Sequence, residues 1–122
     1  MNSAVFHLSG PLHLCGKSHF IADEPPLQGQ LYAKFLFSPV AHAQITNLDI
    51  SAAEKIPGLI KIITADSIPG ENQIGTVVKD EPLFPETEIM YVGEPIAMVL
   101  AENEYMAELA VKKIGLRFKV LP

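Results

Sequence analysis

The chain has 122 residues, of which 48% are hydrophobic and 19% are charged, and its formal net charge is −5. This length suits one domain with a sizeable core, and the composition is globular rather than disordered. The nine Lys and Arg residues are scattered and form no basic patch, which argues against nucleic acid and anionic membranes as partners. No apolar run approaches the length of a membrane span, and the N-terminus is a poor signal peptide. We therefore expect one cytoplasmic domain over residues 1–122.

The first half of the chain predicts three strands and one short helix. Two weaker candidates for strands precede them, at residues 5–8 and 18–21. Ser51 and Glu54 match a capping box, in which each side chain bonds the other residue's backbone N–H, so we expect a short helix that ends at Pro57. The three strands are expected at 31–37, which is aromatic-rich and expected to be buried, at 43–50 and at 59–64.

A long irregular segment, residues 65–88, follows these strands. It contains three prolines and two glycines, and a loop of this length in a compact domain is usually functional or docked against something. The apolar pair Leu83-Phe84 is costly to expose, so we expect part of residues 70–88 to pack on a neighbouring domain. A short helical turn is also expected at 65–68.

The last third of the chain predicts three strands and the clearest helix. Asn103 is a good N-cap, and Gly115 lies where a residue in the left-handed conformation ends a helix. Between them, four apolar residues follow the i, i+3, i+4, i+7 spacing of a helix with one buried face. The strands are expected at 89–93, 95–102 and 116–122. These elements indicate an α+β fold with a mixed sheet, one short helix and one longer helix.

Three histidines near the N-terminus, His7, His13 and His19, are candidates for a metal site. Neighbouring members are six residues apart, which is about 20 Å along an extended strand, whereas the ligands of one zinc ion lie within about 4 Å of each other. Turns could still bring them together, so a metal site stays open beside the favoured interpretation of three exposed or internally bonded histidines.

His42, in the stretch SPVAHAQI, and Cys15 are the candidates for catalysis. A catalytic histidine needs a partner that holds its tautomer, and the nearest carboxylate in sequence is Asp49. The favoured interpretation is a corner histidine whose ring bonds backbone across a turn. A reactive thiolate needs a nearby cation or a helix N-terminus, so we expect Cys15 to be a small buried or half-buried residue. As the one cysteine of the chain, it forms no internal disulfide.

The acidic residues of the long segment have a structural explanation. Prolines interrupt them, unlike the alternating ligands of a calcium loop, so a solvated acidic loop is expected. These residues are Asp80, Glu81, Glu86 and Glu88. The glycines form no phosphate-binding motif. We therefore expect no catalytic, cofactor-binding or metal-binding residue in this chain.

Several segments, taken in order, resemble one family. SPVAHAQI stands as its S-P-x-A-H-A-x-I element, and DISAAEKIPGL, ADSIPGEN, DEPLF and YVGEPIAMVLA resemble the elements that follow it. CGKSHFIAD resembles an opening T-G-x-A-x-Y-x-x-D segment, with Cys15, Ser18 and Phe20 differing, and FKVLP resembles a final E-x-L-P. Together they are similar to the N-terminal α/β hammerhead domain of the molybdopterin-binding subunit in the xanthine dehydrogenase / aldehyde oxidase family. The resemblance covers about residues 10–122 and leaves 1–9 as an N-terminal extension.

The resemblance implies a structural domain of an oxidoreductase. In that family the larger domains after the hammerhead bind molybdopterin, hold substrate and supply the glutamate base. The parent enzyme would hydroxylate a purine or aldehyde carbon with water and pass electrons through iron–sulfur clusters to FAD or another acceptor. The expected partners are downstream molybdopterin-binding domains and FAD and iron–sulfur domains or subunits. No residue of the family's site maps onto this chain, so SPVAHAQI is expected to be a fold element and the chain alone to be inactive.

Two other functions are kept beside this one. The alternative is a free-standing interaction module or small subunit that docks a separately encoded catalytic chain, and it has the same sequence signal. A small metal-binding or ligand-binding protein that uses the N-terminal histidines is less favoured.

Overall fold

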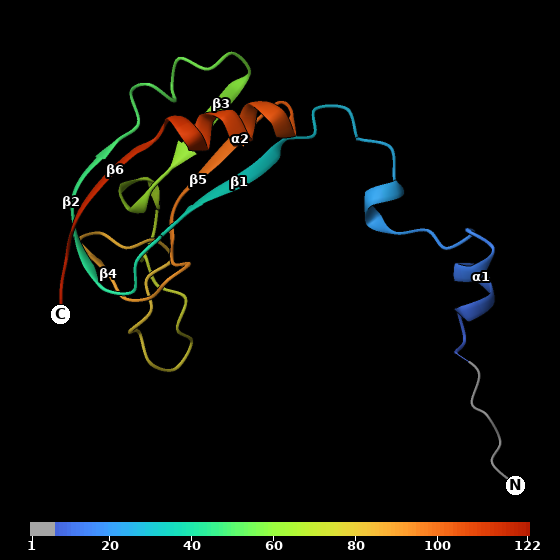
Figure 1. The fold of residues 1–122 in the computed structure, drawn as a ribbon, viewed down its shortest axis with the longest axis horizontal. Coiled ribbons are helices and arrows are strands. Elements are labelled where there is room, and N and C mark those ends of the chain that lie inside the picture. The colour runs from blue at the N-terminus through green and yellow to red at the C-terminus, as the bar shows by residue number, and fades with distance from the viewer. Residues whose placement is uncertain (1–6) are drawn as a thin grey trace, which may run out of the picture.

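The computed structural model describes residues 7–122, which form a folded body and an N-terminal arm, residues 7–30, that runs away from it (Figure 1). Within these residues the strands make two three-stranded sheets, ordered β1-β5-β3 and β4-β2-β6. The elements are α1 Gly10–Leu14, the 3-10 turn η1 Ile21–Asp23, β1 Tyr32–Phe37, β2 Ala43–Asp49, β3 Leu59–Ile63, the 3-10 turn η2 Ala65–Ser67, β4 Glu88–Ile89, β5 Pro95–Ala101, α2 Glu104–Lys113 and β6 Gly115–Val120.

The α+β class expected from the sequence is confirmed, but the single mixed sheet is wrong. Every observed strand pair is antiparallel, and the consecutive strands β2 and β3 belong to different sheets. The short connection between β2 and β3 therefore carries the chain from one sheet to the other, instead of crossing over within one sheet.

The first sheet and α2 form the larger core. β5 is its central strand, and its small residues Ala97 and Ala101 pack against Ala107 and Ala110 of α2. Small residues on both faces let the helix lie close to the sheet. Val99, which is fully buried between them, contributes about 1.5–3 kcal/mol by its burial.

The helix α2 begins as the sequence predicts. The side chain of Asn103 accepts a hydrogen bond from the backbone N–H of Met106 at 2.9 Å, so the N-cap is confirmed. Its end differs from the prediction: Ile114 is the C-cap in extended conformation, and Gly115 begins β6 without a positive φ. The chain leaves the helix directly into a strand, so no left-handed residue is needed there.

The second sheet has a smaller core. Ala43 of β2, Ile89 of β4 and Ile96 of β5 are its fully buried members. Leu36 and Leu48 pack against both cores and so join the two sheets. The predicted strand at 89–93 is shortened to Glu88–Ile89, because the chain turns at Gly93, which has a φ of 85°.

The predicted short helix after β2 is wrong. Residues 51–55 form turns, and both the N–H and the hydroxyl of Ser51 donate to the Asp49 carboxylate, at 3.0 and 2.6 Å. That bond takes the hydroxyl away from the capping position. A short helix exists instead at α1, in the arm.

The arm differs from the sequence prediction as well. Residues 18–20 are irregular and Ile21 begins η1, so the strand candidate at 18–21 is wrong. The candidate at 5–8 lies mostly outside the described residues, and residues 7 and 8 are not in a strand. Leu8, Leu14 and Ile21 are almost fully exposed, because the arm does not pack on the body (Figure 1). No helix among residues 7–122 is long and apolar enough to cross a membrane.

Candidate functional site

The N-terminal histidines come only partly together. The ring centroids of His7 and His13 are 5.9 Å apart, His13 stacks on Phe20 at 5.8 Å, and Nδ1 of His7 lies 3.1 Å from Ser9 Oγ. No group of three or more His, Cys, Asp or Glu side chains that could hold a metal is found in residues 7–122. These rings therefore have local aromatic and hydroxyl neighbours.

Cys15 does not occupy the buried or half-buried position expected for it. It is a free, exposed thiol at the C-cap of α1. The expectation is wrong because α1 belongs to the arm, which has no buried residue of its own.

His42 is the candidate with the most specific surroundings. Its Nε2 lies 2.6 Å from Glu88 Oε1, and its Nδ1 lies 2.9 Å from the backbone oxygen of Pro122. The ring thus bonds backbone, as expected of a corner histidine, but it also has a carboxylate partner that sequence distance concealed. The pKa of His42 is raised above its ordinary value. The hydrogen bond with the Pro122 backbone oxygen is the largest cause, and the hydrogen bond with the Glu88 carboxylate is the second. The imidazole is about one-third exposed, so water screens this pair.

The corner between β1 and β2 is built on a buried serine. Ser38 Oγ donates to the carbonyl of Val40 at 2.7 Å and accepts from the Val40 N–H at 3.1 Å. The Ser38 backbone bonds the turn before β5 twice, donating to the Glu94 carbonyl at 2.8 Å and accepting from Gly93 at 2.9 Å. The hydroxyl and both backbone groups of Ser38 are therefore hydrogen-bonded within the corner or to the turn before β5.

Glu94 is the second buried polar residue, with 3% of its surface exposed. Its carboxylate accepts a hydrogen bond from the backbone N–H of Met90 at 2.6 Å. This bond closes the turn between β4 and β5. A buried carboxylate in a pocket would suggest a catalytic acid or base, but this carboxylate is hydrogen-bonded to a backbone N–H.

The long loop is held from within. Phe84, one of the apolar pair that the sequence marks as costly to expose, is 2% exposed, so the chain itself covers it without a neighbouring domain. The side chain of Asn72 bonds both backbone groups of Phe84 and keeps its ring inside the body. Leu83 remains partly exposed, with 38% of its surface accessible.

An apolar groove of about 470 Å³ runs along the outer face of the first sheet. Phe35, Ile63 and Met98, which lie side by side on β1, β3 and β5, form its floor, and Leu83 and Ile68 form its wall. Phe35 and Phe37 are about half exposed, so the prediction of a buried strand holds for only one face of β1. This face is the most apolar of the described hollows.

Comparison with known proteins assigns the family. Residues 15–122 match the family described as aldehyde oxidase and xanthine dehydrogenase, a/b hammerhead domain. The chain belongs to this hammerhead family. It is 35% identical to xanthine dehydrogenase 1 of Arabidopsis thaliana over 122 residues and 36% identical to aldehyde oxidase 4 of Mus musculus over 114 residues. These matches take up 100% and 93% of this chain but only 9% and 8% of the relatives.

A solved structure confirms the hammerhead fold. The aldehyde oxidoreductase from Desulfovibrio desulfuricans superposes with a TM-score of 0.82 at 27% identity, over 98% of this chain and 14% of that one. The hammerhead chain therefore spans a small part of the proteins that it resembles.

The segments that carry the resemblance have a common structural role in this hammerhead chain. Ser38 and His42 hold the corner of SPVAHAQI, Asn72 of the PGEN element holds Phe84 of DEPLF, and Glu94 closes the YVGEP turn. Sequence reasoning missed Asn72 and Glu94 as anchors. Their partners are backbone groups, which no residue pattern identifies.

Proposed function

We propose that the chain is a single α/β hammerhead domain, residues 1–122, of a molybdenum-cofactor-dependent hydroxylase, and that its role is structural. The observation that carries this proposal is how its polar side chains are used. Ser38, Asn72 and Glu94 bond backbone groups, and His42 bonds one backbone oxygen and one carboxylate. The groove along the first sheet is lined mainly by apolar side chains, and no group of three His, Cys, Asp or Glu side chains that could hold a metal is found in residues 7–122. By its family the parent enzyme is an oxidoreductase, which we propose hydroxylates a purine or aldehyde carbon in the cytoplasm.

We infer that the cofactors are held by other parts of that enzyme. Molybdenum bound to molybdopterin would supply the hydroxylation chemistry, and iron–sulfur clusters and FAD would carry the electrons away. Iron–sulfur clusters are held by two or more cysteine thiolates, usually four, whereas this chain has one cysteine. The donor set of the described residues also lacks any three-residue metal group. The residues of this chain therefore do not fit an iron–sulfur cluster.

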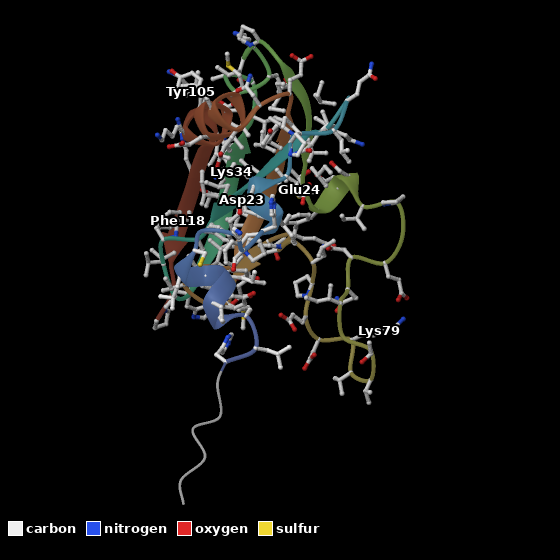
Figure 2. All side chains as sticks on the ribbon, turned by 90° about the vertical axis from the view of Figure 1, so that its right-hand side faces the viewer. Asp23, Glu24, Lys34, Lys79, Tyr105 and Phe118 are labelled. Atoms are coloured by element: carbon white, nitrogen blue, oxygen red, sulfur yellow. The ribbon has the colours of Figure 1, made fainter. Side chains whose placement is uncertain are left out.

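The long loop is strongly acidic, which suits a surface that docks a basic partner. Residues 65–88 hold six acidic residues and one lysine, so their formal charge of −5 equals that of the whole chain, and the remaining acidic and basic residues balance. At its tip, Val77 and Val78 are 93% and 62% exposed. Lys79, which pairs with Glu71, marks this end of the molecule, far from Tyr105 of α2 (Figure 2). An apolar tip inside an acidic rim suits a partner surface that is apolar and basic.

We propose that the loop and the adjoining apolar groove face the molybdopterin-binding domains. Amide hydrogen exchange tests this, with the chain measured alone and together with those domains. We expect slower exchange in residues 70–88 and in β1, and unchanged exchange in α2, whose exposed face lies at the other end. Equal protection of residues 70–88 in both samples contradicts the docking.

Charge variants sharpen the same experiment. Removing two loop charges with Asp80→Asn and Glu81→Gln should weaken association at low salt, and the loss should shrink as salt screens it. Glu24→Gln with Glu54→Gln removes the same charge from exposed sites outside the loop and serves as the matched control. Elemental analysis of the chain alone completes the test, since stoichiometric molybdenum would overturn the structural role.

The alternative is an interaction module that docks a separately encoded catalytic chain. It would use the same surface, so the docking experiment does not distinguish it. The gene beyond codon 122 does: several hundred further codons in frame favour the domain, and a stop codon favours the module.

A further inference from the structure

Three segments that are distant in sequence meet at His42. It precedes β2, whose first residue Ala43 lies opposite Ile89 of β4 and Val120 of β6. The ring bonds Glu88 of β4 through Nε2 and the Pro122 backbone oxygen through Nδ1. The His42 carbonyl accepts from the N–H of Leu121 at 3.0 Å. One residue therefore holds the end of the long loop, residues 65–88, and the segment after β6 against the start of β2.

The two ring contacts determine the protonation state of the imidazole. A backbone oxygen only accepts hydrogen bonds, and an ionised carboxylate only accepts as well. Both ring nitrogens of His42 must therefore donate, which requires the doubly protonated imidazolium. A neutral imidazole has one N–H, so it keeps one contact and turns a lone pair toward the other oxygen.

We propose that His42 is a proton-dependent clasp, which as imidazolium fastens residues 121–122 and β4 to the start of β2. When it loses its proton it loosens residues 121–122, because the one remaining N–H stays on the ionised Glu88 carboxylate, the stronger acceptor. This goes beyond the structural role of the domain, because it makes the link between two of its surface segments adjustable. The long loop ends at β4, so the clasp also couples that loop to the segment that follows β6.

The two oxygen atoms that contact the ring favour its protonated form. On the flanking strands, the charged residues nearest in register are Glu88 on β4 and Lys119 on β6, both opposite Gln44. The β1–β2 corner, residues 38–41, carries no charged side chain, and the carboxylate of Glu94 from the adjoining turn is engaged with Met90 N–H. The pKa of His42 is raised, first by the Pro122 backbone oxygen and then by Glu88. Since the folded pKa lies above the unfolded one, the clasp is complete below about pH 6.5 and is lost as the pH rises through the folded pKa.

The experiment uses NMR on the 122-residue chain with an amidated C-terminus, so that Pro122 presents a neutral carbonyl instead of a carboxylate, and on two variants of it. Imidazole ¹⁵N shifts report the charge and tautomer of His42, and the exchange protection of the Leu121 amide reports the clasp. In the native chain we expect this protection to fall about three- to tenfold as His42 loses its proton, which is the loss of roughly one partly exposed hydrogen bond. The amide of Met106, bonded to Asn103, should keep its protection over the same range.

Glu88→Gln separates the clasp from a merely structural contact. A carboxamide can donate, so neutral His42 can accept from Gln at Nε2 while donating to Pro122 from Nδ1. We expect this variant to lower the pKa of His42, to populate the Nδ1–H tautomer, and to keep Leu121 protection within about twofold across the titration. His42→Gln should remove the pH response altogether.

The outcomes are decisive in both directions. If His42 titrates at its ordinary value, or if Leu121 protection ignores the titration, the clasp is overturned. A Glu88→Gln protein whose Leu121 protection still falls with His42 deprotonation overturns it too. Should His42→Gln fail to fold, the native and Glu88→Gln titrations alone decide.

Discussion

Asn72 bonds both backbone groups of Phe84, which lies twelve residues further along the chain. Its Nδ2 donates to the Phe84 carbonyl at 2.7 Å, and its Oδ1 accepts from the Phe84 N–H at 3.0 Å. Asn72→Ala leaves a part-buried donor and acceptor unsatisfied, so we expect it to lower the free energy of unfolding by about 1–3 kcal/mol. Asn72→Asp, which can accept but not donate, should fall between. Urea unfolding measures both.

The neighbouring Gln73 provides the control. It is exposed, and its side chain makes no hydrogen bond among those of the described residues. Gln73→Ala should stay within about 0.5 kcal/mol of the native chain. An equal cost for Gln73→Ala and Asn72→Ala would contradict the anchoring role of Asn72.

Phe84 and its neighbour Leu83 should differ sharply in their contributions to stability. Phe84 is 2% exposed, whereas Leu83 is 38% exposed. Phe84→Ala empties a filled core site, and we expect it to cost about 3–5 kcal/mol. Leu83→Ala should cost less than about 1 kcal/mol in the isolated chain, and its effect should appear instead in association with the partner domains. Similar unfolding midpoints for the two variants would show that Phe84 is not a core residue.

The strands and the main helix could be predicted because their signals are local. β1, β2, β3 and β5 appear within two residues of their predicted bounds, since β-branched runs and turn residues define them. Asn103 marks the start of α2 in the same way. The division into two sheets could not be predicted, because β1 pairs with β5 across the whole long loop. Pairing of that kind depends on packing between distant segments.

The capping-box pattern at Ser51 misled the prediction, because the Ser51 hydroxyl bonds Asp49 instead. This bond leads to a prediction about the pH dependence of stability. The Ser51 hydroxyl, and then its N–H, bond the Asp49 carboxylate and lower its pKa below the ordinary value. Because the folded pKa is depressed, this contribution to stability is present above about pH 4 and is lost as the pH falls through the folded pKa. Ser51→Ala removes the hydroxyl, so the pKa of Asp49 should rise toward 3.8. A carboxyl ¹³C titration measures it.

Thr46→Val is the matched control for that titration. It removes an exposed hydroxyl from β2, the same strand as Asp49, and should leave the pKa of Asp49 unchanged. If both variants shift it equally, the Ser51 bond is not the cause.

The sequence could predict that His42 is a candidate residue, but it could not predict the partners of its ring. The sequence identified His42 as a corner residue, but Glu88 and Pro122 lie 46 and 80 positions away. Only the antiparallel pairing of β2 with β4 and β6 brings them to the ring. The exposure of Cys15 was also hidden, because whether the arm packs on the body is a tertiary property.

Two glycines of the long loop test whether its tip has a defined conformation. A Cβ at Gly75 would lie 1.8 Å from the Val78 carbonyl oxygen, whereas one at Gly70 would meet nothing within 4 Å. The backbone bond from Ile74 N–H to the Glu81 carbonyl, at 2.9 Å, closes the same tip. Gly75→Ala must move backbone, so it should cost about 1–3 kcal/mol and speed exchange of the Ile74 amide. Gly70→Ala should be neutral or stabilise by up to about 1 kcal/mol, because it restricts only the unfolded chain. Equal exchange of Ile74 in both variants would mean that the tip is not held in this conformation, and the exposed Val77 and Val78 could not then present a preformed surface to a partner.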